Sequence, residues 1–278
     1  TSYTGIADDS MSGDTTLAFT NTAKKTLKVS KAILGDFADP TKEFAFTLKL
    51  TKEDAAGGDA SQLYLVCDNV ENVLNPDSTD GIYNIALKGG EDVTFTLPHD
   101  TKYTLTEADY AAYVTTLKVD GANAAAADVQ QKLLKENKDI AFLNTAKVTE
   151  LIVGKNVRNQ ENTGLGTGNE NKEFAFTVTF TKNGGFIPEE IAGLNRLVGN
   201  TSTDTVNSTS AVYQFNLKHG ETKQFYPLPY DVDYKIEEVD YTAHGYVKVD
   251  DVTGNLTDNK TPFEDKGNTG IFTASDTK

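Results

Sequence analysis

The sequence is poor in the residues that build disulfides and metal sites. Its 278 residues include one cysteine, three histidines, one methionine and no tryptophan. A single cysteine cannot form a disulfide within the chain, and Cys67, inside an apolar run, is interpreted as a small buried hydrophobe. So few thiol and imidazole ligands exclude a structural zinc site. We therefore expect no metal and no cofactor.

Long apolar runs and excess positive charge are also missing. No stretch approaches the roughly 18 apolar residues that span a bilayer, and 41 acidic against 26 basic residues give a net charge of −15. This charge argues against a nucleic-acid partner and against binding to anionic membranes. The N-terminus has no basic and apolar leader, so a signal peptide is expected to be absent or already removed. Because no P-loop, zinc motif or nucleophile elbow is present, we do not expect an enzyme that turns over.

An internal repeat organises the chain. Residues 42–47 read KEFAFT, and the same six letters recur at 172–177, an offset of 130 residues (172 − 42). Residues 83–91, YNIALKGGE, return at the same offset as YQFNLKHGE, and residues 103–110, YTLTEADY, return as YKIEEVDY at 234–241. Because order and spacing hold across most of each unit, the sequence predicts two copies of one domain.

A further match lies out of phase with the repeat. Residues 18–24, AFTNTAK, resemble residues 141–147, AFLNTAK, which close the first unit. No similar segment with an asparagine closes the second unit. We therefore predict that residues 1–25 are the closing strand of a preceding unit or a donor strand. Residues 26–147 form the first sandwich, and residues 148–278 form a second sandwich without its own closing asparagine strand.

Short β-strands dominate the expected secondary structure. Threonine, valine, phenylalanine and tyrosine alternate with polar residues between turns rich in glycine, asparagine and aspartate. Residues 122–137 are the best helix candidate, as one short helix or a surface excursion, and Pro188 begins a second short helical turn. The expected fold is all-β, a sandwich in each unit, with one or two short helices in loops. The clearest predicted strands cover residues 27–31, 44–50, 93–97, 103–107 and 140–144.

Strand alternation places three polar side chains on the inward face. Lys31 shares a face with two apolar residues of its strand, and the same count places Glu107 and Asn144 inside the first unit. Burial without a partner would be costly for each. Equivalent positions are Lys155 and Glu238 in the second unit and Asn21 before the first.

Three explanations of this inward set remain open from the pattern. The residues form a hydrogen-bonded ion cluster, or they lie at strand ends where their tips reach water, or they react. Desolvation lowers the pKa of a lysine and raises that of a glutamate. A neutral amine could then attack the asparagine side-chain carbonyl while the acid shuttles protons, which releases ammonia and leaves an isopeptide bond.

The ordered pattern resembles a known family. A first strand Leu-x-Val-x-Lys, a strand containing Thr-Glu-x-Asp-Tyr and a closing Phe-x-Asn-Thr strand are similar to those of Cna protein B-type (CnaB) domains of Gram-positive surface proteins, and most of all to streptococcal T-antigen-like major pilins. The likeness covers nearly the whole chain from about residue 26. It implies tandem inverse immunoglobulin-like β-sandwiches, end to end, each with a Lys–Asn isopeptide bond between its first and last strands.

The resemblance assigns a role to each inward residue. In the first unit Lys31 is the amine donor, Glu107 the promoting acid and Asn144 the acceptor. In the second unit Lys155 and Glu238 match donor and acid, but Ala274 occupies the place nearest to the missing acceptor. Either the chain has lost the ends of two neighbouring domains, or Asn21 supplies the acceptor to Lys155, from another molecule or within one folded-back chain.

The resemblance also implies a function and a location. We expect a structural subunit or stalk of a pilus or cell-wall-anchored surface protein of a Gram-positive bacterium, outside the cell, with neighbouring copies in a fibre or tandem array as partners. The alternative is an adhesin that binds a host glycan or matrix protein through the inserts at 54–78 and 156–171. The family's Leu-Pro-x-Thr-Gly sorting signal is not found in these 278 residues.

Overall fold

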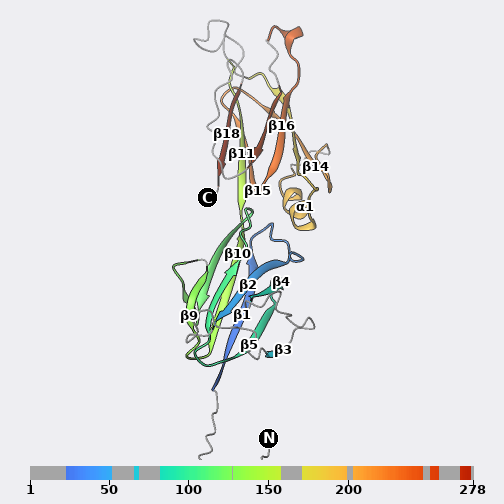
Figure 1. The fold of residues 1–278 in the computed structure, drawn as a ribbon. Helices are drawn as coiled ribbons and strands as arrows, with labels where there is room; N and C mark the ends of the chain where they lie inside the picture. The colour runs from blue at the N-terminus through green and yellow to red at the C-terminus, as the bar shows by residue number, and fades with distance from the viewer. Residues whose placement is uncertain are drawn as a thin grey trace, which may run out of the picture.

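Two β-sandwiches follow each other along the chain (Figure 1). The computed structural model describes residues 23–51, 66–68, 82–126, 128–157, 171–198, 203–246, 251–256 and 270–276, and at residue 51 and in 66–68 and 270–276 the backbone alone. The prediction of an all-β fold with tandem immunoglobulin-like sandwiches is confirmed. Within the described ranges, no helix is both long and apolar enough to cross a bilayer.

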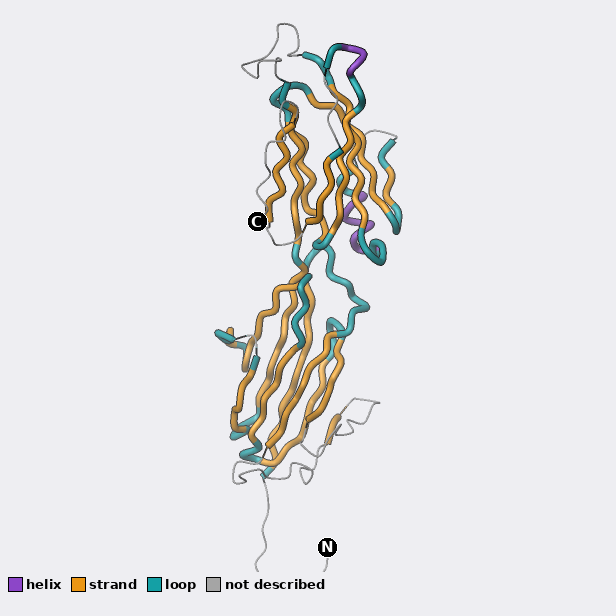
Figure 2. The backbone as a smooth tube through the Cα atoms, turned by 45° about the horizontal axis from the view of Figure 1, so that its top comes forward, coloured by secondary structure: helices purple, strands orange, loops and turns teal. Residues whose placement is uncertain are grey.

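The first sandwich has a six-stranded sheet that faces a four-stranded sheet (Figure 2). The strand orders are β3-β5-β1-β10-β7-β8 and β4-β2-β6-β9. The first unit's strands are β1 (Lys24–Leu34), β2 (Phe44–Thr51), β3 (Val66–Asp68), β4 (Ile82–Leu87), β5 (Asp92–Pro98), β6 (Lys102–Glu107), β7 (Tyr113–Val119), β8 (Ala122–Asn123), β9 (Val129–Leu133) and β10 (Lys138–Ala146).

The second sandwich repeats this plan with fewer described strands. Its sheets have the orders β15-β11-β18 and β13-β14-β12-β16-β17. The elements are β11 (Val148–Lys155), β12 (Phe174–Thr181), α1 (Pro188–Asn195), β13 (Thr205–Val206), β14 (Ser210–Leu217), β15 (Thr222–Pro229), β16 (Val232–Glu238), the 3₁₀ turn η2 (Thr242–His244), β17 (Val252–Leu256) and β18 (Gly270–Asp276).

Each unit has a hydrophobic core of its own. Inward positions of both sheets fill it, and edge-to-face aromatic pairs such as Phe46 with Phe142 and Phe180 with Phe225 pack across it. Such pairs add to the stabilisation that burial itself provides. The five strands predicted most clearly from alternation all exist, as parts of β1, β2, β5, β6 and β10.

Of the two predicted helices, one is present and one is wrong. Pro188 is at the start of α1, and Glu190 accepts the Ile187 backbone N–H through Oε2 at 3.1 Å, which satisfies one free donor at the helix start. The described residues of the first segment, 122–126 and 128–137, instead form β8, β9 and turns. Val129 and Leu134 enter the core from this segment, so tertiary packing overrides its alanine-rich composition.

The last strand of each unit runs in a different direction relative to the first strand of that unit. β10 lies beside β1 and parallel to it, whereas β18 lies beside β11 and antiparallel to it. β10 ends at Ala146 and β11 begins at Val148, so one residue separates the two units. The predicted closing or donor strand in residues 1–25 lies almost wholly outside the described residues.

Candidate functional site: a buried lysine, glutamate and asparagine

The three inward residues of the first unit meet inside its sandwich. Lys31 Nζ lies 2.7 Å from Glu107 Oε1, and Asn144 Nδ2 lies 2.6 Å from the same oxygen. The side chains of Lys31 and Glu107 are 0% and 2% exposed, and Asn144 is fully buried. Since both nitrogens contact one oxygen, they lie no farther apart than the sum of these two distances.

Strand register explains why these side chains converge. β1 and β10 are neighbours in one sheet, with Asn144 opposite Ile33, two residues beyond Lys31. Because side chains two apart point to the same face, Lys31 and Asn144 both face the second sheet. Glu107 comes from that second sheet, at the end of β6, where it pairs with Phe46 of β2. The acid therefore reaches the amine and the amide from across the core.

Burial sets the protonation of this site. Desolvation lowers the pKa of the Lys31 amine, and the hydrogen bond and charge of Glu107 only partly oppose it. Desolvation likewise raises the pKa of Glu107, against the opposing effects of Lys31 and Asn144. Both shifts favour the neutral forms. A neutral amine is a nucleophile, and a neutral carboxylic acid can donate a proton.

The acid and the amide of this site each keep one buried oxygen without a partner among the described residues. Glu107 Oε2 and Asn144 Oδ1 are the buried side-chain atoms without a hydrogen-bond partner among the described residues. Oxygen and nitrogen of an asparagine amide are assigned from the hydrogen-bond network. If Glu107 carries a proton and the amide is rotated by half a turn, the acid donates to Asn144 Oδ1 across the 2.6 Å contact. That arrangement polarises the carbonyl that an amine would attack.

Two phenylalanines form the wall around the amine, and the sequence reasoning did not assign them to the site. Lys31 Nζ lies 4.3 Å from the ring centroid of Phe44 and 5.8 Å from that of Phe46. Both rings are buried on β2 and exclude water from the lysine. The signal that could have identified them was the repeated hexapeptide KEFAFT, because it contains both rings.

The second repeated motif holds the backbone of Lys31. The Lys31 N–H donates to Glu91 O at 2.9 Å, and the Gly90 N–H donates to Lys31 O at 2.8 Å. Glu91 also accepts the Lys88 N–H through Oε2 at 2.7 Å, which fixes the turn. This turn therefore holds β1 at the lysine by two backbone hydrogen bonds.

The second unit reproduces the same surroundings. Lys155 Nζ lies 2.5 Å from Glu238 Oε1 and 4.0 Å from the ring centroid of Phe174. Burial lowers the pKa of Lys155 and raises that of Glu238. The backbone of Lys155 is held by Glu221 O at 3.0 Å and by the Gly220 N–H at 2.8 Å. Donor and acid are thus placed as in the first unit.

The acceptor position differs between the units. In β18 it is Gly270 that lies opposite Lys155, and Ala274 lies opposite Leu151, four residues earlier on β11. The expectation that Ala274 occupies the place of the missing acceptor is therefore wrong, because β18 runs antiparallel where β10 runs parallel. Asn21, the other candidate acceptor, lies outside the described residues.

Nothing else in the described ranges gathers into a site of reactive or ligating groups. In the part of the chain that is placed, no group of three or more His, Cys, Asp or Glu side chains is arranged to hold a metal ion. Cys67 is in β3, where the backbone alone is described. The Lys31–Glu107–Asn144 set is therefore the strongest chemical feature of the molecule.

Comparison with known families gives two matches, one for each unit. Residues 25–146 and residues 149–269 both match the family described as "Domain of unknown function (DUF7601)". The chain belongs to this family. Each match contains one of the buried lysine–glutamate pairs.

Individual relatives connect this tandem DUF7601 chain with pili. It is 27% identical to a protein named "Pilin" from Streptococcus pyogenes serotype M1, over 82% of this chain and 74% of that protein. The crystal structure of the major pilin from Streptococcus pyogenes matches over 92% of this chain and 99% of that chain, at 20% identity and a TM-score of 0.43. The expected likeness to streptococcal pilins is confirmed.

One further match is to a pilus-presented adhesin, Spy0125 (Cpa). The identity is 28% over 44% of this chain, with a TM-score of 0.36. The match spans about a quarter of that adhesin, 27% of its chain.

Proposed function

We propose that this chain is a structural subunit or stalk segment of a pilus or cell-wall-anchored surface protein of a Gram-positive bacterium. A self-formed isopeptide bond between Lys31 and Asn144 would stabilise it. The single observation that carries the proposal is the buried contact of amine, acid and carboxamide at 2.7 Å and 2.6 Å. The likeness to a pilin over most of the chain supports the same function.

The reaction needs only the groups that meet at this site. The neutral Lys31 amine attacks Cγ of Asn144 while protonated Glu107 donates to Oδ1. Glu107 then takes the proton lost by the amine nitrogen and delivers it to the amide nitrogen. The C–N bond to that nitrogen breaks and ammonia leaves. The proton on Oδ1 returns to Glu107 as the carbonyl forms again, so Glu107 ends protonated, as it began. Fixed positioning replaces the high concentration that such a reaction needs in solution. The step occurs once per molecule, so we assign no turnover activity.

The bond would give the fold a mechanical role. It joins the first strand to the last and closes a loop of 113 residues (144 − 31). By analogy with a disulfide, such a closure contributes about 4–5 kcal/mol through the entropy of the unfolded chain. Unlike a disulfide, an isopeptide bond cannot be reduced. Tension applied at the ends would pass through a covalent link between β1 and β10 rather than through their hydrogen bonds.

In the second unit we propose that Lys155 and Glu238 receive an acceptor from outside the described strands. The first unit fixes the geometry: the acceptor strand must run parallel to the lysine strand, with its asparagine opposite the residue two beyond the lysine. That residue is Val157 in the second unit. Asn21 of another chain is the candidate, which would make neighbouring copies in a fibre covalent partners.

An adhesin function is the second candidate, and the likeness to the pilus-presented adhesin is the observation that favours it. The inserts at 54–78 and 156–171, the expected binding loops, lie mostly outside the described residues. A screen against host glycans and matrix proteins tests this function. Binding that is lost on deleting an insert would support it, and absence of binding would leave the structural role alone.

Intact mass under denaturing conditions tests the leading proposal. We expect the protein to be lighter than its sequence by one ammonia molecule for the first unit, and the difference to vanish in Lys31→Ala. A wild-type mass equal to that of the plain sequence would refute the cross-link. Covalent multimers on a denaturing gel, lost in Lys155→Ala, would support the joint between chains.

A further inference from the structure

The connection between the two units is very short. Lys147 is the one residue between β10 and β11, and its N–H donates to Ala112 O at 2.9 Å. The loop after β1 is pressed against this connection, since a Cβ placed on Gly35 would lie 3.1 Å from Cβ of Ala146. Few backbone torsions are therefore available to change the angle between the two units.

An aromatic side chain of the first unit reaches into the second. Phe37, in the loop that follows β1, is 5% exposed and yet belongs to neither hydrophobic core. Its ring lies against Gly193 of α1: a Cβ on Gly193 would be 2.2 Å from Phe37 Cε1 and 3.1 Å from Cζ. A Cβ atom essentially never lies within 3.0 Å of a heavy atom of another residue, so an alanine at position 193 would not fit without a shift of the ring. The glycine thus makes a notch in the helix surface that the ring fills.

Two polar contacts lie beside this notch. Arg196 Nη2 is 3.5 Å from Asp36 Oδ1, with both side chains more than half exposed. Lys147 Nζ is 5.2 Å from the ring centroid of Tyr230. Exposed ion pairs hold a geometry weakly because water screens them and long side chains lose freedom in making them. The buried ring is therefore the strongest of the three contacts.

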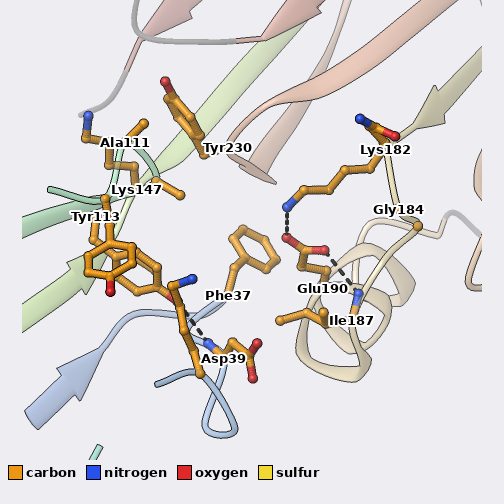
Figure 3. Close-up of a pocket in the computed structure, with 16 residues that line it drawn as sticks. Phe37, Asp39, Ala111, Tyr113, Lys147, Lys182, Gly184, Ile187, Glu190 and Tyr230 are labelled. Atoms are coloured by element: carbon orange, nitrogen blue, oxygen red, sulfur yellow. Dashed lines mark hydrogen bonds and ion pairs between the residues drawn. The ribbon is translucent and has the colours of Figure 1, made fainter. Parts of the chain in front are cut away.

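Much of the remaining space between the units is not filled. A cavity of about 400 Å³ lies beside Phe37, and both units line it (Figure 3). The first unit and the connection contribute Asp39, Tyr113 and Lys147, and the second unit contributes Lys182, Glu190 and Tyr230. Glu190 is buried and held by Lys182 and by the Ile187 N–H, so this wall is itself well fixed. The orientation of the units consequently depends on a few contacts and not on a broad interface.

We propose that the Phe37–Gly193 contact is a lock that holds the two sandwiches in one fixed orientation, so that the tandem bends as a single rod. Domains joined by small polar interfaces move relative to each other by default. A ring seated in a glycine notch, beside a one-residue connection, removes that freedom. The inference is independent of the isopeptide proposal, because none of these residues belongs to either lysine–glutamate site.

Distance measurements between two spin labels test the lock. The labels are placed at the exposed positions Lys118 of the first unit and Thr222 of the second, in a Cys67→Ser background. We expect a narrow distance distribution for the otherwise unchanged chain, and a distribution about twice as broad for Phe37→Ala, because the default mobility of linked domains returns. Asp36→Ala, which removes the exposed ion pair alone, is the matched control and should stay narrow.

A double-mutant cycle separates the lock from a local effect on the helix. Gly193→Ala should broaden or shift the distribution when Phe37 is present, and should add nothing when residue 37 is already alanine. Alanine favours a helix, so a loss of helix stability cannot imitate this result. A broad distribution in the unchanged chain would overturn the proposal. So would a Phe37→Ala variant as narrow as its parent, or equal effects of Gly193→Ala in both backgrounds.

Discussion

Lys31 Nζ and Glu107 Oε1 are 2.7 Å apart in a place where neither side chain is more than 2% exposed. Taking two charges out of water costs more than their attraction returns in many buried pairs. Such a pair needs a reason other than stability, and Asn144, bonded to the same carboxylate, supplies one. The proposed reaction has an uncharged product, so on that proposal the cost of burial ends when the bond forms.

Replacing Glu107 should leave the first unit uncross-linked. In Glu107→Ala the amine loses its proton acceptor and the amide loses its acid, so the intact mass should equal that of the sequence. The folded state should also lose about 4–5 kcal/mol with the opened loop, and more again because Lys31 remains as an unpaired buried amine. Mass spectrometry and urea unfolding measure the two effects.

Asp92→Asn is the control for that experiment. It breaks the ion pair between Lys28 of β1 and Asp92 of β5, where both side chains are about half exposed. We expect the ammonia loss to persist and the free energy of unfolding to change little, because water screens this exposed ion pair. Ammonia loss in Glu107→Ala would show that another group promotes the reaction.

The rate of cross-linking should pass through a maximum with pH. The pKa of Lys31 is lowered by burial, so the amine becomes protonated and unreactive only when the pH falls below that lowered value. The pKa of Glu107 is raised, so the acid is lost when the pH rises above that raised value. In the reactive state Lys31 and Glu107 share one dissociable proton. The rate should fall at lower pH, where the pair holds two protons, and at higher pH, where it holds none.

Freshly translated protein, followed by mass over time at several pH values, provides the measurement. A bell-shaped profile is expected. A rate that keeps rising with pH would mean that the neutral amine suffices and that Glu107 does not act as an acid.

The alternation of apolar and polar residues along the strands was enough to predict which polar side chains point inward. The direction of the last strand in the second unit could not be predicted from it. Lys31 and Glu107 were assigned to the inward face because each lies an even number of residues from apolar residues of its own strand. A shift of one residue would have exposed those apolar residues to water. The helix predicted for residues 122–137 failed because the core took Val129 and Leu134 from a strand and a turn. The antiparallel course of β18 depends on the path of the preceding chain, which alternation does not encode.

Asn144→Ala should lower stability mainly through loss of the bond. We expect a loss of about 4–5 kcal/mol from the opened loop, with about 1 kcal/mol more for the hydrogen bond to Glu107. Denaturant unfolding of the single and double variants tests this. In a Glu107→Ala background the bond is already absent, so adding Asn144→Ala should cost far less. Equal costs in both backgrounds would mean that Asn144 contributes by packing alone.

Phe44→Leu should slow cross-linking without preventing folding. The smaller side chain leaves space beside Lys31 Nζ, which now lies 4.3 Å from the ring centroid. Water entering that space would reduce the desolvation of the amine and bring its pKa back toward the ordinary value. The time course of ammonia loss in freshly translated protein is the readout.

Phe174→Leu is the matched control, because Phe174 has the same position beside Lys155 in the second unit. It should leave the rate of the Lys31–Asn144 reaction unchanged. If both variants slowed that reaction equally, the effect would belong to general stability and not to the wall of the site.

The second unit should accept a strand that carries Asn21. In the first unit Phe142 lies opposite Lys31 and Asn144 opposite Ile33. The same parallel register would place Phe19 opposite Lys155 and Asn21 opposite Val157. β18 now lies antiparallel along this side of β11, from Thr149 to Lys155. A synthetic peptide of residues 15–24 is therefore expected to form an adduct whose mass is that of chain plus peptide, less one ammonia.

Substitutions separate this strand capture from nonspecific reaction. The adduct should disappear in Lys155→Ala and with a peptide in which Asn21 is replaced by alanine, and it should persist in Lys31→Ala. An adduct that survives Lys155→Ala would place the reaction elsewhere. If the peptide never reacts while the first unit still loses its ammonia, the Lys155–Glu238 pair is a structural ion pair, and the bond in the first unit stands on its own.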